Sequence, residues 1–215
     1  MILDEDTSKA VLASYGISRP AYMIIHSRDI ERLWAQADLV CLKYPVVAKI
    51  LGADMAHKTE IKGVIVGIDG PDRLLQAIDA LSKRHPGKDI LVEEFIPHSA
   101  EFILGLTRDT TFGQMVMFGA GGIAAELYSD VAFRKAPITE GEAKRMVAST
   151  QIGKLFNGYR GIDMDQVAVT SALVGICRLS KDGVNGKRVI GLDVNPVAYV
   201  NGKLIALDAK LMVEA

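Results

Sequence analysis

The chain has 215 residues, of which 49% are hydrophobic and 24% are charged, and its formal net charge is -1. This length is ample for a sizeable core in one domain or two small lobes. A chain so evenly balanced lacks the basic stripe that holds a phosphate backbone, which argues against nucleic acid as a partner. No apolar run approaches the roughly 18 residues that span a bilayer, and no signal sequence opens the chain. We therefore expect a cytoplasmic protein with no membrane partner.

Helix and strand patterns alternate along the first part of the chain. The spacing predicts helices over residues 8–15, from residue 27 onward and over 71–83, and strands over 21–25, 46–51 and 63–68. A polar stretch at 85–89 follows. We place a boundary there, between an N-terminal lobe, 1–88, and a C-terminal lobe, 89–215.

The second part continues the alternation. It predicts strands over 90–96, 101–108, 113–118 and 188–194, and helices over 139–156 and 165–180. Asn201 and Gly202 form the strongest short hairpin signal. Cys41 and Cys177 lie in apolar stretches and are predicted to be reduced core residues. The pattern predicts an α+β chain, with mixed sheets and helices packed on them.

Lys49 is a single lysine inside a predicted apolar strand. An unpaired ammonium would be costly in a half-buried strand, and a bound phosphate would offset that cost by pairing with it. The alternative is an edge strand whose lysine reaches solvent with its ammonium group. Spacing alone favours the edge-strand interpretation.

The segment 52–63, between two predicted strands, gathers His57 with Lys58 and other charged side chains. A histidine near neutral pH can offer an uncharged nitrogen as a nucleophile to a phosphoryl group, and neighbouring lysines would steady the transferred charge. A charged loop around one histidine is also typical of an ordinary solvated loop. Only the general preference of functional sites for loops supports the catalytic interpretation here.

Asp193, Asn195 and Asp208 place oxygen ligands near the two ends of the final hairpin. Carboxylates and an amide oxygen suit magnesium, which keeps several waters and needs few protein ligands. Turn chemistry explains the same residues, because Asp and Asn-Pro are common in turns. A glycine cluster at 119–122 could bring backbone N–H groups to an anion. It matches neither a Walker motif nor a dinucleotide fingerprint.

These pieces, in this order, resemble the ATP-grasp β portion of ADP-forming acetyl-CoA synthetase and of its fused acyl-CoA synthetase relatives. The resemblance covers almost the whole chain. The stretches that carry it are YPVVAKI at 44–50, AHKTE at 56–60, FGAGG at 118–122, DVAFRKAP at 130–137 and DVNP at 193–196.

The resemblance implies an ATP-grasp fold, in which two α+β lobes hold a nucleotide between them. It implies reversible transfer of a phosphoryl group between a phosphohistidine, matched by His57, and ADP or ATP with Mg2+. It also implies a partner that binds CoA, either a separate α subunit or a fused α portion.

The same resemblance assigns further roles by matched position. Lys49 matches a strand lysine that touches nucleotide phosphates, and Lys58 follows the carrier histidine. Glu93, Glu94 and Phe95 match the hinge between the lobes, which meets adenine. Glu101 matches the acidic residue near the ribose. Gly121, Gly122 and Arg134 match positions that help to hold phosphate. The magnesium ligands are matched by Asp193, Asn195 and Asp208.

Two positions depart from the family pattern. Lys62 stands where a second glycine is usual, and Gly191 stands where an acidic residue is common. A lysine at 62 resembles relatives fused to a protein acetyltransferase, some of which are regulatory. The alternative function is therefore a regulatory ATP-grasp-like domain without turnover. A third hypothesis, a carboxylate–amine ligase, leaves His57 without a role.

Overall fold

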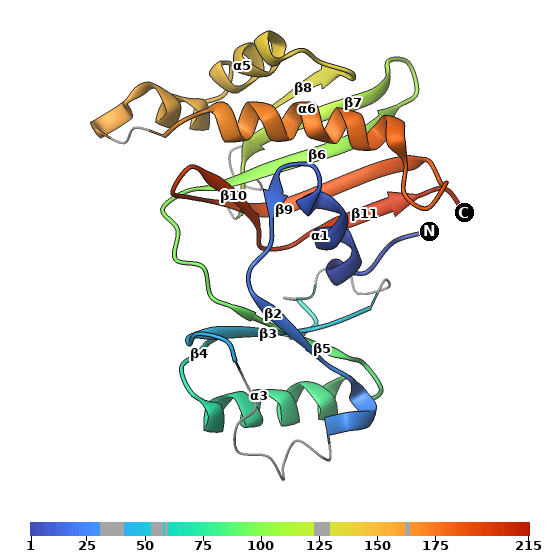
Figure 1. The fold of residues 1–215 in the computed structure, drawn as a ribbon, viewed down its shortest axis with the longest axis vertical. Helices are drawn as coiled ribbons and strands as arrows, with labels where there is room; N and C mark the ends of the chain where they lie inside the picture. Colours follow the sequence, from blue (N-terminus) through green and yellow to red (C-terminus); the bar gives the residue numbers. More distant parts are fainter. Residues whose placement is uncertain (31–40, 53–57, 59, 123–129, 162–163) are drawn as a thin grey trace. The chain divides into compact units, whose positions relative to one another are not determined.

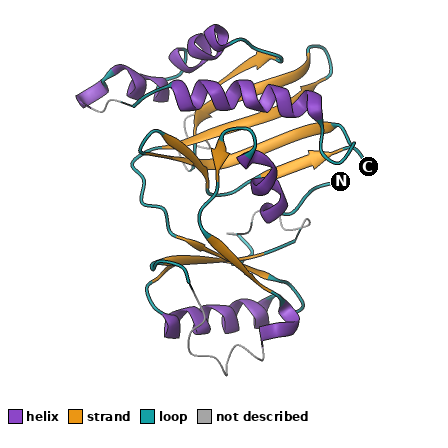
Figure 2. Ribbon diagram, in the orientation of Figure 1, coloured by secondary structure: helices purple, strands orange, loops and turns teal. Residues whose placement is uncertain are grey.

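The computed structural model describes residues 1–30, 41–52, 58, 60–122, 130–161 and 164–215. The chain forms two compact units, one of residues 1–19 with 97–215 and one of residues 20–96. Each unit has its own sheet (Figure 2) and its own hydrophobic core. Two units that each combine a sheet with helices confirm the predicted α+β fold class.

The smaller unit is a four-stranded antiparallel sheet with one long helix on one face (Figure 1). Its strand order is β2 (Tyr22–Ile25), β5 (Ile90–Glu94), β3 (Val46–Ile50), β4 (Val64–Ile68). The helix is α3 (Pro71–Arg84), which begins with a proline at its first position, and the short 3-10 helix η1 is Ser27–Asp29. Helical spacing puts Leu74, Ala77, Ile78 and Leu81 on the face that packs against the sheet.

The larger unit is a seven-stranded sheet in the order β1 (Ile17–Ser18), β10 (Lys203–Ala206), β9 (Val189–Val200), β6 (Glu101–Asp109), β7 (Gly113–Ala120), β8 (Val131–Lys135). The seventh strand, β11 (Lys210–Val213), also pairs with β9. The helices are α1 (Glu5–Ala13), α5 (Glu140–Ala148) and α6 (Val167–Asp182), with 3-10 helices η2 (Ile152–Asn157) and η3 (Tyr159–Gly161). Figure 1 shows α6 lying across one face of the sheet with α5 beside it.

The long strand β9 organises this larger sheet. One edge of β9 pairs with β6, while its other edge pairs first with β11 and then with β10. The chain therefore passes from β10 to β11 alongside the middle of β9, where the Leu207 N–H donates to the Pro196 carbonyl at 2.9 Å. Phe102 anchors the core beneath, with its ring 5.7 Å from that of Phe118 and 5.4 Å from that of Phe156.

The N-terminal segment belongs to the larger unit. Strand β1 pairs in parallel with β10, and Ile2 forms a bridge with Met212 in β11. Strand β5 belongs instead to the smaller unit, because it is hydrogen-bonded to both β2 and β3. The compact units thus divide the chain differently from the predicted lobes, 1–88 and 89–215.

Several predicted elements differ in extent from the observed ones. The helix predicted over 139–156 ends at Ala148, since the hydroxyls of Ser149 and Thr150 donate back to helix carbonyls. Strands β1, β8 and β11 were not predicted. The turn at Asn201 and Gly202 is confirmed, with φ angles of 49° and 78°. Among the helices of the described segments, none is long and apolar enough to cross a bilayer.

Candidate functional site

In the smaller unit, Lys49 lies on the sheet face opposite α3. Strand β3 is central, between β5 and β4, and alternate residues of β3 face α3. The Lys49 Nζ atom lies 2.9 Å from an Oε2 oxygen of Glu93, and the two residues are only 8% and 2% exposed. Burial on a central strand excludes the edge-strand interpretation. The Glu93 carboxylate is a partner of this buried ammonium.

Glu93 and Glu94 are the last two residues of the neighbouring strand β5, and Phe95 follows them. A carboxylate oxygen of Glu94 accepts the backbone N–H of Lys43 at 2.8 Å. The Phe95 N–H donates to the Pro45 carbonyl, while the Phe95 side chain stays 41% exposed. Glu93 is therefore a charge partner in this structure, and Phe95 supplies an exposed ring. Contact with adenine stays a prediction for all three.

The segment after β3 carries the predicted carrier histidine, and His57 lies outside the described residues. Lys58 is described and is 8% exposed, and its carbonyl accepts the Gly63 N–H at 2.7 Å. This contact closes a turn in which Lys62 has a φ of 53°, in the left-handed region that favours glycine. The family pattern at position 62 thus has a backbone cause, because this turn suits glycine better than lysine.

In the larger unit, Asp193 and Asn195 share one face of β9. Asp193 lies opposite Gly105 in β6 and opposite Lys210 in β11, whereas its neighbours Leu192 and Val194 point into the core. Asp208 comes from the crossover between β10 and β11, which runs beside this part of β9. The fold therefore brings the three predicted magnesium ligands to one place in the unit.

The electrostatics of this cluster favour a cation. Asp193 is an exposed residue of β9, but the protein atoms around its carboxyl partly desolvate it and raise its pKa, the neighbouring Asp208 carboxylate raises that pKa further, and Lys210 lowers it. No group of three or more His, Cys, Asp and Glu side chains in the described segments could hold a metal ion. The proposed donor set contains only two carboxylates, those of Asp193 and Asp208, together with the Asn195 amide oxygen. It fits Mg2+, which prefers oxygen donors and keeps part of its water shell.

The glycine cluster is fastened to this set. The Gly122 N–H donates to the Asn195 Oδ1 atom at 2.8 Å, and the Gly121 N–H donates to the Glu101 carbonyl at 2.9 Å. Gly122 has a φ of 59°, in the left-handed region that favours glycine, and a Cβ there would lie 1.9 Å from the Glu101 carboxylate and displace it. Both N–H groups have protein acceptors, which differs from the expectation that they hold phosphate.

The Glu101 carboxylate has a neighbour that the sequence did not single out. The His98 Nε2 atom lies 2.8 Å from a carboxylate oxygen of Glu101. The i, i+3 spacing of His98, just before β6, and Glu101, the first residue of β6, was the available signal.

Arg134 is not brought together with the oxygen ligands. It lies on the edge strand β8 opposite Val116 of β7, whose side chain belongs to the core. The row of directly paired residues that contains Asp193 runs through Gly105 and Met117 instead. The exposed Arg134 guanidinium donates to the Phe133 carbonyl.

Gly191 also has a local explanation. It lies opposite Met212, and a Cβ at Gly191 would be 2.4 Å from the Met212 terminal methyl group. The space next to Asp193, where the family often has an acidic side chain, is occupied here by methionine.

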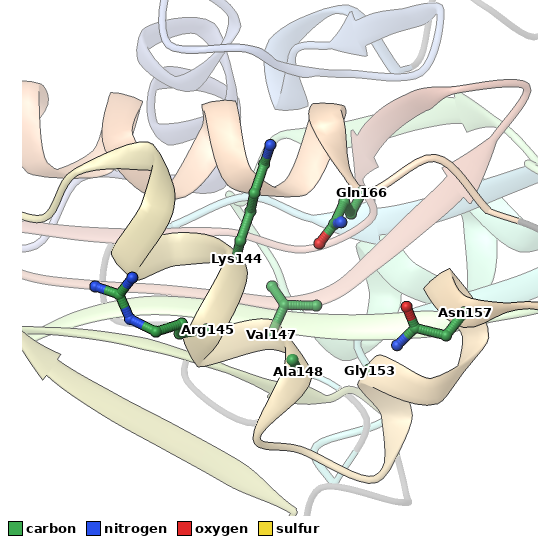
Figure 3. A pocket seen from close by; sticks show the side chains of 7 residues that line it. All are labelled: Lys144, Arg145, Val147, Ala148, Gly153, Asn157 and Gln166. Atoms are coloured by element: carbon green, nitrogen blue, oxygen red, sulfur yellow. The ribbon is translucent and has the colours of Figure 1, made fainter.

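One hollow of about 260 Å3 lies in the larger unit, beside α5. Figure 3 shows the side chains that line it. They come from α5, η2 and the residue before α6: Lys144, Arg145, Val147, Ala148, Gly153, Asn157 and Gln166. None of these residues is a predicted site residue, so the hollow is separate from the candidate site.

Comparisons with known proteins agree with this geometry. The ATP-grasp domain family model matches residues 1–213. The chain is 30% identical, over 99% of its length, to the Archaeoglobus fulgidus acetate–CoA ligase (ADP-forming) II, and it covers 30% of that relative. It is 29% identical to the β subunit of the Pyrococcus furiosus acetate–CoA ligase (ADP-forming) I, with 98% of this chain and 91% of that one covered.

A solved structure is similar across the same length. It is the Ca. Korarchaeum cryptofilum dinucleotide forming acetyl-coenzyme A synthetase 1 in complex with coenzyme A and Mg-AMPPCP, its phosphohistidine segment pointing towards the nucleotide binding site. The identity is 31% and the TM-score is 0.76, with 98% of this chain and 92% of that chain covered. The predicted ATP-grasp fold and the resemblance to the synthetase β portions are confirmed. The chain spans about a third of the length of the first curated relatives that it matches.

Proposed function

Because this chain belongs to the ATP-grasp domain family, we propose that it is the nucleotide-binding component of an NDP-forming acyl-CoA synthetase. It transfers a phosphoryl group between His57 and ADP in the cytoplasm. The observation that carries the proposal is the convergence of Asp193, Asn195 and Asp208 at one place in the larger unit. Two mutually repelling carboxylates beside an amide oxygen are costly without a cation and suit a magnesium nucleotide.

In the transfer step, the bond between phosphorus and the His57 nitrogen breaks as a terminal oxygen of ADP bonds to the phosphorus. The electron pair returns to the imidazole, which is left neutral, and ATP is the other product. Lys49 and Lys58 offset charge on the phosphates, and the contact with the buried Glu93 holds the Lys49 ammonium in place. Asp193, Asn195 and Asp208 would hold Mg2+, which supplies charge neutralisation and alignment of the phosphates when bound.

The synthetase reaction needs a second component. The Pyrococcus furiosus relative is a β subunit, whereas the Archaeoglobus fulgidus relative is more than three times as long as this chain. We propose that a CoA-binding α subunit, or a fused α portion, makes the acyl phosphate and phosphorylates His57 in turn. These steps run towards ATP, and the whole reaction is reversible. In the opposite direction it joins a carboxylate to CoA at the expense of ATP, which yields ADP and phosphate.

The two departures from the family pattern favour a second candidate, a regulatory domain that binds nucleotide without turnover. Both departures are nevertheless accommodated locally. Lys62 is accepted by a turn in the left-handed region, and Met212 fills the space beside Gly191. Neither change removes a proposed ligand, so the catalytic function is the one that we favour.

Labelling with radioactive ATP separates the two functions. The chain is incubated with Mg2+ and ATP labelled at the γ-phosphate, and acid-labile, base-stable label is mapped by mass spectrometry. We expect label on His57 that is lost in His57→Ala and retained in His85→Ala, a matched control in the α3 cap. Nucleotide binding without label, with a CoA-binding partner present, would overturn the catalytic function. Label on serine or threonine would exclude this class of enzyme.

A further inference from the structure

Lys9 in helix α1 is a lysine with no exposed surface at all. Its Nζ atom lies 2.6 Å from a carboxylate oxygen of Glu5, one helical turn earlier, and both side chains are at most 1% exposed. The same ammonium donates to the Leu207 carbonyl at 2.8 Å. Because an unpaired ammonium cannot be buried at acceptable cost, this geometry fixes the charge between two named acceptors.

The Leu207 carbonyl belongs to the peptide unit that leads into Asp208. That peptide is planar, so the direction of the carbonyl sets the direction in which the Asp208 backbone starts. Leu207 is also tied to β9, because its N–H donates to the Pro196 carbonyl at 2.9 Å. The residue before Asp208 is thus held from β9 on one side and from α1 on the other.

Helix α1 also holds the chain after Asp208. The Leu211 N–H donates to the buried Ser8 hydroxyl oxygen at 3.1 Å, and that hydroxyl donates to the Asp4 carbonyl at 2.7 Å. Ser8 and Lys9 are consecutive, so one turn of α1 fastens both ends of the short crossover. Asp208 and Lys210, which flank Asp193, lie between the two fastened points.

We propose that Lys9 is a positioning residue for magnesium binding, which it serves by holding the Leu207 carbonyl and thereby the Asp208 carboxylate. The inference rests on the proposed function. Stability alone gives a weak reason for a buried ion pair, since apolar replacements of similar volume are often neutral or stabilising. A fixed carbonyl next to a metal ligand gives a specific reason for the ion pair, because the groups that hold a metal ligand set its orientation.

The double variant Glu5→Leu/Lys9→Met tests the proposal without leaving a buried charge. We expect the affinity for Mg2+, measured by calorimetry on the full chain with a non-hydrolysable ATP analogue, to fall about 10- to 100-fold. The melting temperature and the metal-free affinity for the analogue stay unchanged. Hydrogen exchange at the amides of residues 207–209 accelerates in the absence of any ligand, a readout independent of the metal.

The matched control is Asp79→Leu/Lys83→Met, which removes an exposed i, i+4 pair on α3, where Nζ and Oδ2 are 2.8 Å apart. It leaves the Mg2+ affinity and the exchange at residues 207–209 unchanged. If the α1 double variant does not fold, Ser8→Ala is measured in the same way. We expect it to weaken Mg2+ binding about threefold, the effect of one hydrogen bond.

The outcomes separate the two proposals. Unchanged Mg2+ affinity and unchanged exchange in the α1 variant, with normal binding by the parent chain, overturn the positioning role and leave the proposed function standing. A parent chain that binds neither Mg2+ nor the analogue overturns the proposed function, and the positioning role falls with it.

Discussion

Among the described residues, each unit contains a buried lysine–glutamate pair, and these two pairs differ in what surrounds the ammonium group. Lys49 and Glu93 come from neighbouring strands of the smaller sheet, with Nζ and Oε2 2.9 Å apart. Lys9 and Glu5 come from one turn of α1, with the corresponding atoms 2.6 Å apart. The Lys9 side chain has no exposed surface, whereas the Lys49 side chain keeps 11%.

The surroundings of the ammonium groups distinguish the two lysines. Lys9 donates to the Leu207 carbonyl as well as to Glu5, so its charge serves an internal contact. Lys49 lies on the sheet face that α3 leaves uncovered, and we propose that a phosphate joins Glu93 there as a partner. The comparison teaches that burial of a lysine does not identify a ligand site by itself. The identity of the other acceptors decides whether the charge acts on a ligand or on the fold.

Removing either lysine alone gives the largest expected effect. Lys9→Met and Lys49→Met each leave a buried glutamate without its ammonium partner, so each lowers the free energy of unfolding by about 3–5 kcal/mol. Urea denaturation measures both variants. Lys83→Met, which breaks an exposed pair on α3, serves as the control and changes stability by less than about 0.5 kcal/mol. A large loss for only one of the two buried pairs would show that they are not equivalent in the fold.

Replacing both members of each pair separates stability from binding. Lys49→Met/Glu93→Leu recovers most of the lost stability but binds nucleotide about 10- to 100-fold more weakly, because the charge-assisted phosphate contact is gone. Calorimetry with a non-hydrolysable ATP analogue, with and without Mg2+, measures this difference. The α1 double variant has the opposite profile, with normal metal-free nucleotide affinity. Equal losses of nucleotide affinity in both double variants would contradict the distinction between a ligand contact and an internal one.

The contacts of the two buried lysines could be predicted from the sequence only where the partners lie close together along the chain. Periodicity located most strands and α3, and the position of Lys49 within an apolar strand was visible directly. Its partner Glu93 is 44 positions away, and the Lys9 contact with Leu207 spans 198 positions. Spacing carries no information at such distances.

The compact units divide the chain differently from the lobes predicted from the sequence, for the same physical reason. Strand β1 has two residues and joins the larger sheet only by pairing with β10, near the other end of the chain. The short strands β8 and β11 carry exposed or half-buried lysines that obscure any alternation. By contrast, the proximity of Asp193, Asn195 and Asp208 could be anticipated from the sequence, because a hairpin brings nearby residues together whatever the rest of the fold does.

Asp193→Asn sharpens the contrast between charges that are paired and charges that repel. Desolvation by neighbouring atoms and the Asp208 carboxylate raise the pKa of the exposed Asp193, so its ionisation lowers the free energy of unfolding as the pH rises above the ordinary pKa. The variant is therefore more stable near pH 7 without metal, by less than about 1 kcal/mol after solvent screening. The gain disappears below the ordinary pKa of 3.8, where the carboxyl is protonated in both states.

Thermal unfolding without Mg2+ at two pH values measures that gain. The control is Asp109→Asn, because N–H groups of Phe112 and Thr111 lower the pKa of Asp109 and make its charge stabilising. Its removal lowers the melting temperature near pH 7. If Asp193→Asn also lowered the melting temperature, the two carboxylates would not repel each other in the metal-free fold.

The smallest expected effect concerns one backbone position in each unit. Lys62 and Asn201 both have positive φ angles, 53° and 49°, but asparagine tolerates this region better than lysine. Lys62→Gly should stabilise the protein by about 0.5 kcal/mol, the left-handed penalty less the entropy that glycine adds to the unfolded chain. Asn201→Gly should change stability little. Phosphohistidine labelling that survives in Lys62→Gly fits a purely conformational role for this position. Its loss would instead give the Lys62 side chain a part in phosphoryl transfer, and the smaller unit would then contribute a third lysine, after Lys49 and Lys58, whose charge acts on the ligand.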